Sequence, residues 1–282
     1  MGSDPMPNGA TVVTDPDDPR VSDFRHLTDM DFRRRMESPA GLFIAEGFLV
    51  LERVVAKGLP IRDVLIHKKR LDRVSDILDR LPTALRPTVV VADESVLRSI
   101  TGFDVHRGVL ASVQRPPPLS AVQIWGTGGH VAVLEGLVDP TNVGLAFRSA
   151  AAMGFTGCLL SADCADPLYR RAIRTSMGAV LDLPWGRCPP GELDFTELRS
   201  AGLRTIALSP GPEHPTLDDV LDDFAGQSVA AIFGSEGEGI SRRLLTRVDA
   251  IARIPMAAGI DSLNVAATVA VVGYALRCAN GT

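Results

Sequence analysis

Cysteine and aromatic residues are scarce in this sequence. Four of the 282 residues are cysteines, and 5% are aromatic, which together with abundant Ala, Val and Leu indicates helices packed on hydrophobic strands. No two cysteines have the C-x-x-C spacing, and no histidine stands at a metal-ligand spacing from them. We therefore expect small buried thiols in a reducing compartment, and no metal site. The cysteines are Cys158, Cys164, Cys188 and Cys278.

A long apolar run is also missing, because none reaches the length of a transmembrane helix. The first residues, 1–20, are acidic and rich in Pro, Gly and Asp, the reverse of a signal peptide. We therefore expect a cytoplasmic protein with no membrane partner, whose residues 1–20 form a disordered tail.

An excess of positive charge is absent as well, since the net charge is −5. The distribution is uneven: residues 20–122 carry 17 Lys and Arg against 13 Asp and Glu, whereas residues 123–282 carry 12 against 17. Two basic clusters, Arg33–Arg35 and His67–Arg70, lie in the first of these segments. Such clusters are commonly solvated surface, so they permit an RNA partner without demonstrating one.

A triple proline at residues 116–118 divides the chain, because it can continue neither a helix nor a central strand. The predicted organisation is a tail (1–20), a small α/β domain (21–115), a linker (116–122) and a larger α/β domain (123–282). In the smaller domain, strands at 42–45, 61–67, 87–92 and 109–113 alternate with helices at 47–57, 71–81 and 94–100.

The larger domain alternates more strongly. Strands are expected at 130–135, 157–161, 205–209, 228–233 and 250–254, and helices at 143–153 and 262–278. This alternation predicts a mostly parallel sheet, whose ligand site lies at the carboxyl ends of its strands. Three distinctive loops directly follow three of these strands, at Asn142, Gly234 and Met256. We expect these loops to share one site.

Each loop is ambiguous by itself. The loop Phe233–Ile240 has glycines that allow a ligand to approach, but its two glutamates disfavour a phosphate, and a plain strand-to-helix turn uses similar residues. Asn142 and Ser262 each fit a helix cap. Arg148 stands on an otherwise apolar helix, where it either lies on the surface or has an anion near it.

Taken together, the three loops resemble the motifs of the SpoU family of ribose 2′-O-methyltransferases, within the knotted SPOUT superfamily. The matching segments are Asp139-Pro-Thr-Asn-Val-Gly-Leu-Ala-Phe-Arg-Ser-Ala150, Phe233-Gly-Ser-Glu-Gly-Glu-Gly-Ile-Ser241 and Ile254-Pro-Met-Ala-Ala-Gly-Ile-Asp-Ser-Leu-Asn-Val-Ala266. Phe43-Ile-Ala-Glu-Gly47 and Arg107-Gly-Val-Leu-Ala111 are similar to the L30e-like RNA-binding domain often fused to these enzymes.

The resemblance implies a trefoil knot formed by the last strands and the final helix. It also implies a homodimer whose knotted domains pack together and complete the active sites. The cofactor would be S-adenosylmethionine, held mainly by backbone groups. The residues implied to hold it are Leu208, Ser209, Gly234, Ile254, Met256 and Leu263.

The resemblance further implies methyl transfer to a ribose 2′-hydroxyl of RNA, which must lose its proton. The family's arginine is Arg148, but a guanidinium is a poor base, so we expect it to hold a phosphate and stabilise the developing alkoxide. Proton removal then falls to that phosphate, to water or to Glu236. The residues expected to orient the ribose and the loop are Asn142, Ser262 and Asn264.

Ribosomal RNA is weakly favoured over transfer RNA because of the additional basic N-terminal domain. A drug-resistance role of the thiostrepton type stays open. Two other hypotheses are a catalytically silent RNA-binding or ribosome-associated protein of the same fold, and an α/β enzyme of another class, such as a dehydrogenase. The sequence lacks the dinucleotide-binding fingerprint that a dehydrogenase requires.

Overall fold

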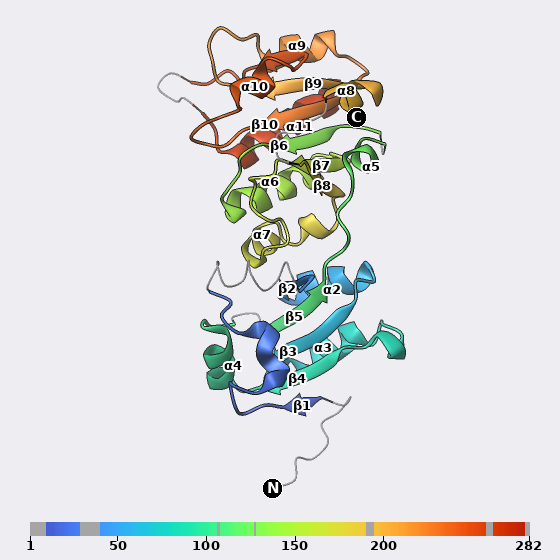
Figure 1. Cartoon of the computed structure of the whole chain (residues 1–282), viewed down its shortest axis with the longest axis vertical. Coiled ribbons are helices and arrows are strands. Elements are labelled where there is room, and N and C mark those ends of the chain that lie inside the picture. Colours follow the sequence, from blue (N-terminus) through green and yellow to red (C-terminus); the bar gives the residue numbers. More distant parts are fainter. Residues whose placement is uncertain are drawn as a thin grey trace. The chain divides into compact units, whose positions relative to one another are not determined.

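A computed structural model of the protein describes residues 10–28, 40–105, 108–126, 128–189, 195–257 and 262–279 (Figure 1). The chain forms two compact units. The N-terminal unit comprises Met1–Pro116 and Leu168–Arg174, and the C-terminal unit comprises Pro117–Pro167 and Thr175–Thr282. The boundary falls within the triple proline, but the sequence gives no sign that Leu168–Arg174 belongs with the first unit.

The N-terminal unit contains a five-stranded sheet with the order β1-β4-β3-β5-β2. Strand β4 pairs in parallel with β1 and β3, and β5 is antiparallel to both β3 and β2. The strands are β1 Thr11–Val12, β2 Leu42–Glu46, β3 Ile61–His67, β4 Thr88–Ala92 and β5 Val109–Gln114. The α-helices between them are α2 Phe48–Ala56, α3 Leu71–Leu78 and α4 Glu94–Thr101.

Short 3₁₀ helices complete the connections of this unit: η2 Pro19–Phe24, η3 Lys68–Arg70 and η4 Thr83–Leu85. The expected disordered tail is wrong for residues 10–20. Thr11 and Val12 pair with β4, and Val13 is 2% exposed. The acidic composition of this segment made its short apolar strand hard to recognise in the sequence. That strand is stabilised by pairing with β4, which lies far along the chain. Residues 1–9 lie outside the described part.

The C-terminal unit contains a six-stranded, fully parallel sheet with the order β11-β9-β10-β6-β7-β8. The mostly parallel α/β sheet predicted from the sequence is therefore confirmed. Its strands are β6 Val131–Leu134, β7 Gly157–Leu160, β8 Trp185–Arg187, β9 Leu203–Leu208, β10 Ser228–Phe233 and β11 Ala250–Ala252.

Helices flank this sheet, and two of them, α6 and α11, pack closely on each other. A Cβ placed on Gly273 would lie 2.5 Å from the Met153 Cβ, so a glycine allows the close approach at this point. The helices of this unit are α5 Ala121–Trp125, α6 Pro140–Ala152, η5 Ala179–Leu181, α8 Phe195–Ser200, α9 Leu217–Asp223, α10 Arg242–Leu245 and α11 Val265–Ala279. Helix α7, Arg170–Thr175, falls almost entirely in the segment that belongs to the N-terminal unit.

Several boundaries differ from the predicted ones. Helix α5, Ala121–Trp125, begins in the predicted linker (116–122) and ends in the larger domain, and Ser120 caps it by accepting a hydrogen bond from the Gln123 backbone. Helix α6 begins at Pro140 rather than Val143, and α11 begins at Val265 rather than Ser262. Strand β8 and the short helices α7 to α10 were not predicted, because their hydrophobic periods are too short to be distinguished from loops.

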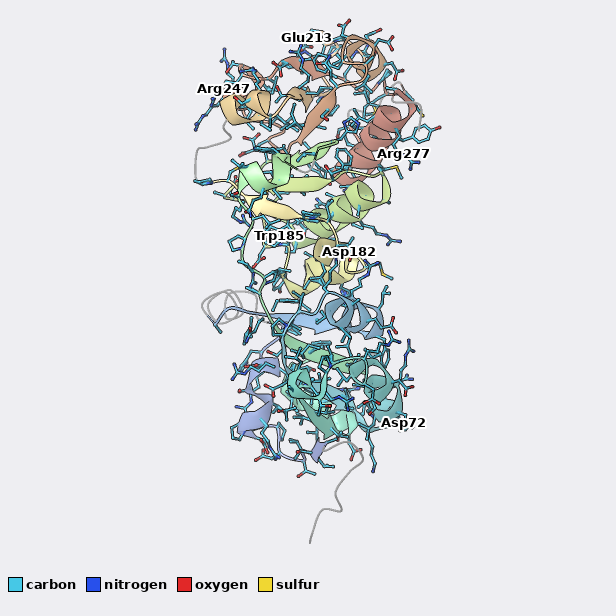
Figure 2. All side chains as sticks on the ribbon, turned by 90° about the vertical axis from the view of Figure 1, so that its right-hand side faces the viewer. Asp72, Asp182, Trp185, Glu213, Arg247 and Arg277 are labelled. Atoms are coloured by element: carbon cyan, nitrogen blue, oxygen red, sulfur yellow. The ribbon has the colours of Figure 1, made fainter. Side chains whose placement is uncertain are left out.

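Charged and aromatic side chains connect α8 to the chain at the β11 edge of the sheet. The Arg247 guanidinium lies 4.7 Å from the centre of the Phe195 ring. Arg247 is labelled in Figure 2. Beside it, the Arg199 guanidinium pairs with Asp249 at 3.1 Å. These contacts join α8 to the segment leading into β11.

Among the helices that the structure describes, none is both long enough and apolar enough to cross a membrane.

Candidate active site

The three distinctive loops meet at one edge of the parallel sheet. They follow β6, β10 and β11. These three strands and β9 are neighbours in the parallel sheet, so the carboxyl ends of the strands lie at the same edge. Side chains from all three loops are directly hydrogen-bonded. The Glu236 Oε1 accepts from Asn142 Nδ2 at 3.1 Å and from Asn264 Nδ2 at 2.5 Å. The predicted meeting of the three loops is therefore observed, and their role as one functional site stays a prediction.

The two asparagines are held for different reasons. Asp139, not Asn142, caps α6 by accepting a hydrogen bond from the Thr141 backbone at 2.8 Å. The helix-cap interpretation of Asn142 is therefore wrong, and its amide is available for Glu236. Asn264 has two roles: its Oδ1 accepts from the Ala266 backbone at 2.9 Å at the start of α11, and its Nδ2 also donates to Asn142 Oδ1 at 3.2 Å.

A cavity of 470 Å³ lies beside this cluster. All six residues expected to hold the cofactor line it, and so do Glu236 and Ser262. Ser262 precedes α11 by three residues, so the helix-cap role considered for it belongs to Asn264 instead. The lining residues that the sequence reasoning missed are Pro210, Phe233, Ser235, Gly237, Glu238, Gly239, Ile240, Leu245, Ala252, Val265 and Thr268. Five of these eleven are direct chain neighbours of predicted residues, and that adjacency was the available signal for them: Pro210, Phe233, Ser235, Gly237 and Val265.

The glycine-rich loop closes on itself. Ser235 N donates to the Gly239 carbonyl at 3.2 Å, and Gly239 N donates to the Ser235 carbonyl at 3.1 Å. A Cβ on Gly234 would lie 2.2 Å from the Gly239 carbonyl carbon, so no side chain fits there. Gly239 itself has φ +68°, in the left-handed region. The glycines therefore form a compact backbone wall for the cavity, as the sequence pattern predicted.

The charge of the cavity is one-sided. Among its described lining residues, Glu236 and Glu238 carry charge, and no Lys, Arg or His is present. The remaining lining is apolar or neutral, which fits an uncharged or cationic ligand and disfavours a phosphate-rich one. Within the described ranges, no group of three His, Cys, Asp or Glu side chains is arranged to hold a metal ion.

Arg148 is not part of this cluster. It is exposed on α6, does not line the cavity, and forms no hydrogen bond or ion pair within the described part of the chain. Of the two alternatives considered for it, the structure of the single chain supports the surface position. Six residues separate it from Asn142, so the two side chains leave the helix about 120° apart.

Comparison with known proteins agrees with this geometry. Residues 129–274 match the SpoU rRNA Methylase family. An uncharacterized tRNA/rRNA methyltransferase of Mycobacterium bovis is 36% identical over 270 residues, which cover 95% of this chain and 92% of the relative. The 23S rRNA (uridine(2479)-2'-O)-methyltransferase of Streptomyces viridochromogenes is 29% identical, covering 86% of this chain and 85% of that protein.

Solved structures give the same picture. The AdoMet-bound rRNA methyltransferase from Sinorhizobium meliloti matches with a TM-score of 0.78 at 25% identity, covering 95% of this chain and 98% of that one. The SpoU methyltransferase AviRb from Streptomyces viridochromogenes matches with a TM-score of 0.74 at 25% identity, covering 92% and 97%. The likeness extends over nearly the full length of each chain.

Proposed function

The chain belongs to the SpoU rRNA methylase family of RNA methyltransferases, and from this premise we propose that it methylates a ribose 2′-hydroxyl of RNA, with ribosomal RNA favoured. The observation that carries the proposal is the hydrogen-bonded cluster of Asn142, Glu236 and Asn264 beside the cavity. In this arrangement, the Glu236 carboxylate, which suits a substrate hydroxyl, lies at a cavity that suits a cofactor.

S-adenosylmethionine fits the cavity residues. Its sulfonium supplies an activated methyl group when it is bound. The apolar lining and the backbone wall at Gly234 suit an adenosine moiety, and the absence of a cation among the described lining residues suits a positively charged sulfur. Leu208, Ile254 and Leu263 supply apolar lining from three separate segments of the chain.

Glu236 is the group best placed to accept the hydroxyl proton. Its Oε1 is occupied by the amides of Asn142 and Asn264, whereas its Oε2 forms no hydrogen bond within the described residues. The amides thus fix the orientation of the carboxylate and leave one oxygen for the substrate hydroxyl. Ser262, which lines the cavity shortly before α11, is proposed to orient the ribose.

Arg148 requires a different explanation, since it stands apart from Glu236 in the single chain. We infer that it acts on the site of a second subunit, where it holds the phosphate beside the target ribose. Support for a homodimer comes from exposed apolar side chains near α6 and along α11. Val138 is 67% exposed, Val271 39% and Tyr274 65%. Such a patch is covered at the interfaces of many oligomers.

The N-terminal unit is proposed to bind the RNA. A trough of 860 Å³ lies where β3 and β4 end, lined by cationic side chains of Lys68, Lys69 and Arg98, and also by Asp93 and Glu94. Lys68 and Lys69 are exposed and have no ion pair within the described residues, whereas Arg98 pairs with Asp104. Free lysines beside a wide trough suit an RNA backbone. The carboxylates suit donor groups of an unpaired base.

Mapping of ribose methylation tests the proposed function directly. Total ribosomal and transfer RNA from cells with and without the protein is compared at nucleotide resolution for 2′-O-methyl groups. We expect one ribosomal position to lose its methyl group when Glu236 is replaced by Gln or the protein is absent. A missing position in transfer RNA instead identifies the alternative substrate, and an unchanged map contradicts the enzymatic function. Calorimetry with S-adenosylmethionine separates an enzyme from a silent RNA-binding protein.

A further inference from the structure

Two carboxylates line a cavity that has no Lys, Arg or His among its described lining residues. Glu236 and Glu238 lie two residues apart on the glycine-rich loop, and both line the cavity. They differ in their hydrogen bonds. Glu236 is occupied by two amides, as described above. The Glu238 carboxylate forms neither a hydrogen bond nor an ion pair in the part of the chain that the structure describes.

The loop fixes the position of Glu238 through its backbone. Glu238 N donates to Ser235 Oγ at 3.3 Å, inside the ring closed by the paired backbones of Ser235 and Gly239. Gly237 separates the two glutamates, and both of their side chains are exposed. The closed turn therefore holds the Glu238 carboxylate at the cavity. Within the described residues, no hydrogen bond or ion pair gives this carboxylate a structural role.

The charge of the ligand changes during the reaction. S-adenosylmethionine carries a positive sulfonium, an ammonium and a carboxylate, whereas S-adenosylhomocysteine has an uncharged thioether. A carboxylate beside the pocket attracts the first ligand more than the second, because only the first has a net positive charge. Glu236 also carries a charge, but its free oxygen is assigned to the substrate hydroxyl, so Glu238 is the residue whose charge has no other proposed role.

We propose that Glu238 is a specificity-determining residue that favours the charged methyl donor over the demethylated product. It acts by charge alone, without contact with the RNA. The inference rests on the cofactor named under the proposed function. Its expected consequence is weaker product inhibition in the native protein than in a protein without this carboxylate.

Calorimetric titration of the full chain tests the inference. Glu238→Gln keeps the size of the side chain and removes its charge. We expect its Kd for S-adenosylmethionine to rise about two- to five-fold, the range of an exposed ion pair, while the Kd for S-adenosylhomocysteine stays unchanged. Sinefungin, which has a charged amine in place of the methylsulfonium, should follow S-adenosylmethionine. Added salt should reduce the difference between wild type and variant.

Matched variants separate charge from structure. Glu238→Asp keeps the charge and should retain most of the selectivity. Asp223→Asn removes an exposed carboxylate at the end of α9, outside the cavity lining, and should leave both Kd values unchanged. Equal shifts for both ligands in Glu238→Gln, or no shift for either, overturn the inference while leaving the cofactor intact. If the wild type binds neither ligand, the proposed function fails together with the inference.

Discussion

At the scale of single residues, the active site depends on the division of work between the two oxygens of Glu236. One oxygen accepts from Asn142 and Asn264, which come from segments 122 residues apart. The other forms no hydrogen bond within the described residues and is proposed to receive the substrate hydroxyl. Sequence motifs name all three residues but do not reveal this division, because hydrogen-bond partners depend on where the backbone brings the side chains.

Replacement of Glu236 by Gln should lower kcat by about 10²- to 10⁴-fold, the usual contribution of a general base. The Kd for S-adenosylmethionine should change little, because the side-chain volume is kept. Rates measured across pH on a reconstituted RNA substrate check this. A near-normal rate and pH profile in the variant would rule out Glu236 as the base. Arg148→Ala, assayed in parallel, should also lose activity but retain the shape of the pH profile.

The cysteines provide a second residue-scale prediction. Cys158, Cys164 and Cys188 are buried, as expected from the sequence, but Cys278 is exposed, so the expectation is wrong for that residue. Burial raises the pKa of Cys188 to about 12 and the pKa of Cys158 well above its ordinary value. Since the thiolate is the reactive form, Ellman's reagent should modify Cys278 faster than the three buried thiols, and all four thiols only after denaturation. Rapid reaction of the Cys278→Ser variant would contradict this.

At the scale of elements, one aspartate joins two neighbouring strands of the parallel sheet. Asp249, just before β11, accepts hydrogen bonds from the Thr205 backbone at 2.8 Å and from its hydroxyl at 2.7 Å. Burial alone raises the pKa of Asp249, but these bonds and the Arg199 guanidinium outweigh it, so the pKa lies below its ordinary value. Strand β11, which leads into the third motif, is thereby held against β9.

Replacement of Asp249 by Asn should lower the free energy of unfolding by about 1–3 kcal/mol at neutral pH, the cost of losing hydrogen bonds to a charged group. A carboxyl whose pKa is lowered by folding stabilises the folded protein at pH values above the pKa that it has in the unfolded chain. This stabilisation is lost as the pH falls through the pKa that the carboxyl has in the folded protein. The difference between wild type and variant should therefore shrink below about pH 4. Urea unfolding at neutral and acidic pH measures it. A difference that stays constant with pH would mean that the carboxylate charge is not involved.

At the scale of the whole molecule, the proposed function predicts that a second subunit completes the site. Tyr274→Asp places a charge in the exposed apolar face of α11, and we expect a monomer by light scattering, with methyl transfer lost. Leu85→Asp is a matched control, because Leu85 is 58% exposed in the N-terminal unit. It should remain dimeric. A dimeric Tyr274→Asp protein would contradict the proposed interface.

Mixing two inactive variants extends this test. In a mixed dimer of Arg148→Ala and Glu236→Gln chains, one site receives Glu236 from one chain and Arg148 from the other. Activity should therefore reappear on mixing if the sites are shared between subunits. Continued inactivity of a verified mixed dimer would place Arg148 outside the partner's site.

RNA binding by the N-terminal unit predicts a strong dependence on salt. Replacement of Lys68 and Lys69 by Ala should weaken binding of 23S ribosomal RNA and reduce the salt slope by about 1.4, for two backbone contacts. Filter binding from about 50 to about 200 mM salt measures this. Arg80→Ala, an exposed cation outside the trough, is the control, and the Kd for the cofactor should not change in either protein. An unchanged slope in the double variant would place the RNA elsewhere.

By itself, the sequence determined the class of sheet, the three loops and eight of the residues that line the cavity. These follow from local patterns: apolar periods mark strands and helices, and glycines and amides mark the loops after them. The predicted boundaries erred where a cap decided them, as at Asp139 and Asn264, because several nearby residues could cap equally well. The trefoil knot implied by the resemblance stays a prediction.

Only the tertiary structure decided the contacts between distant segments. It gave β1 its place on β4, joined Asn142 to Glu236 and Asn264, and left Arg148 exposed on α6. A sequence cannot settle these points, since each depends on the order of strands in a sheet and not on any local pattern. The few cysteines show the same limit of sequence-based prediction. Their small number indicated buried thiols, but Cys278 is exposed because of the face on which α11 packs.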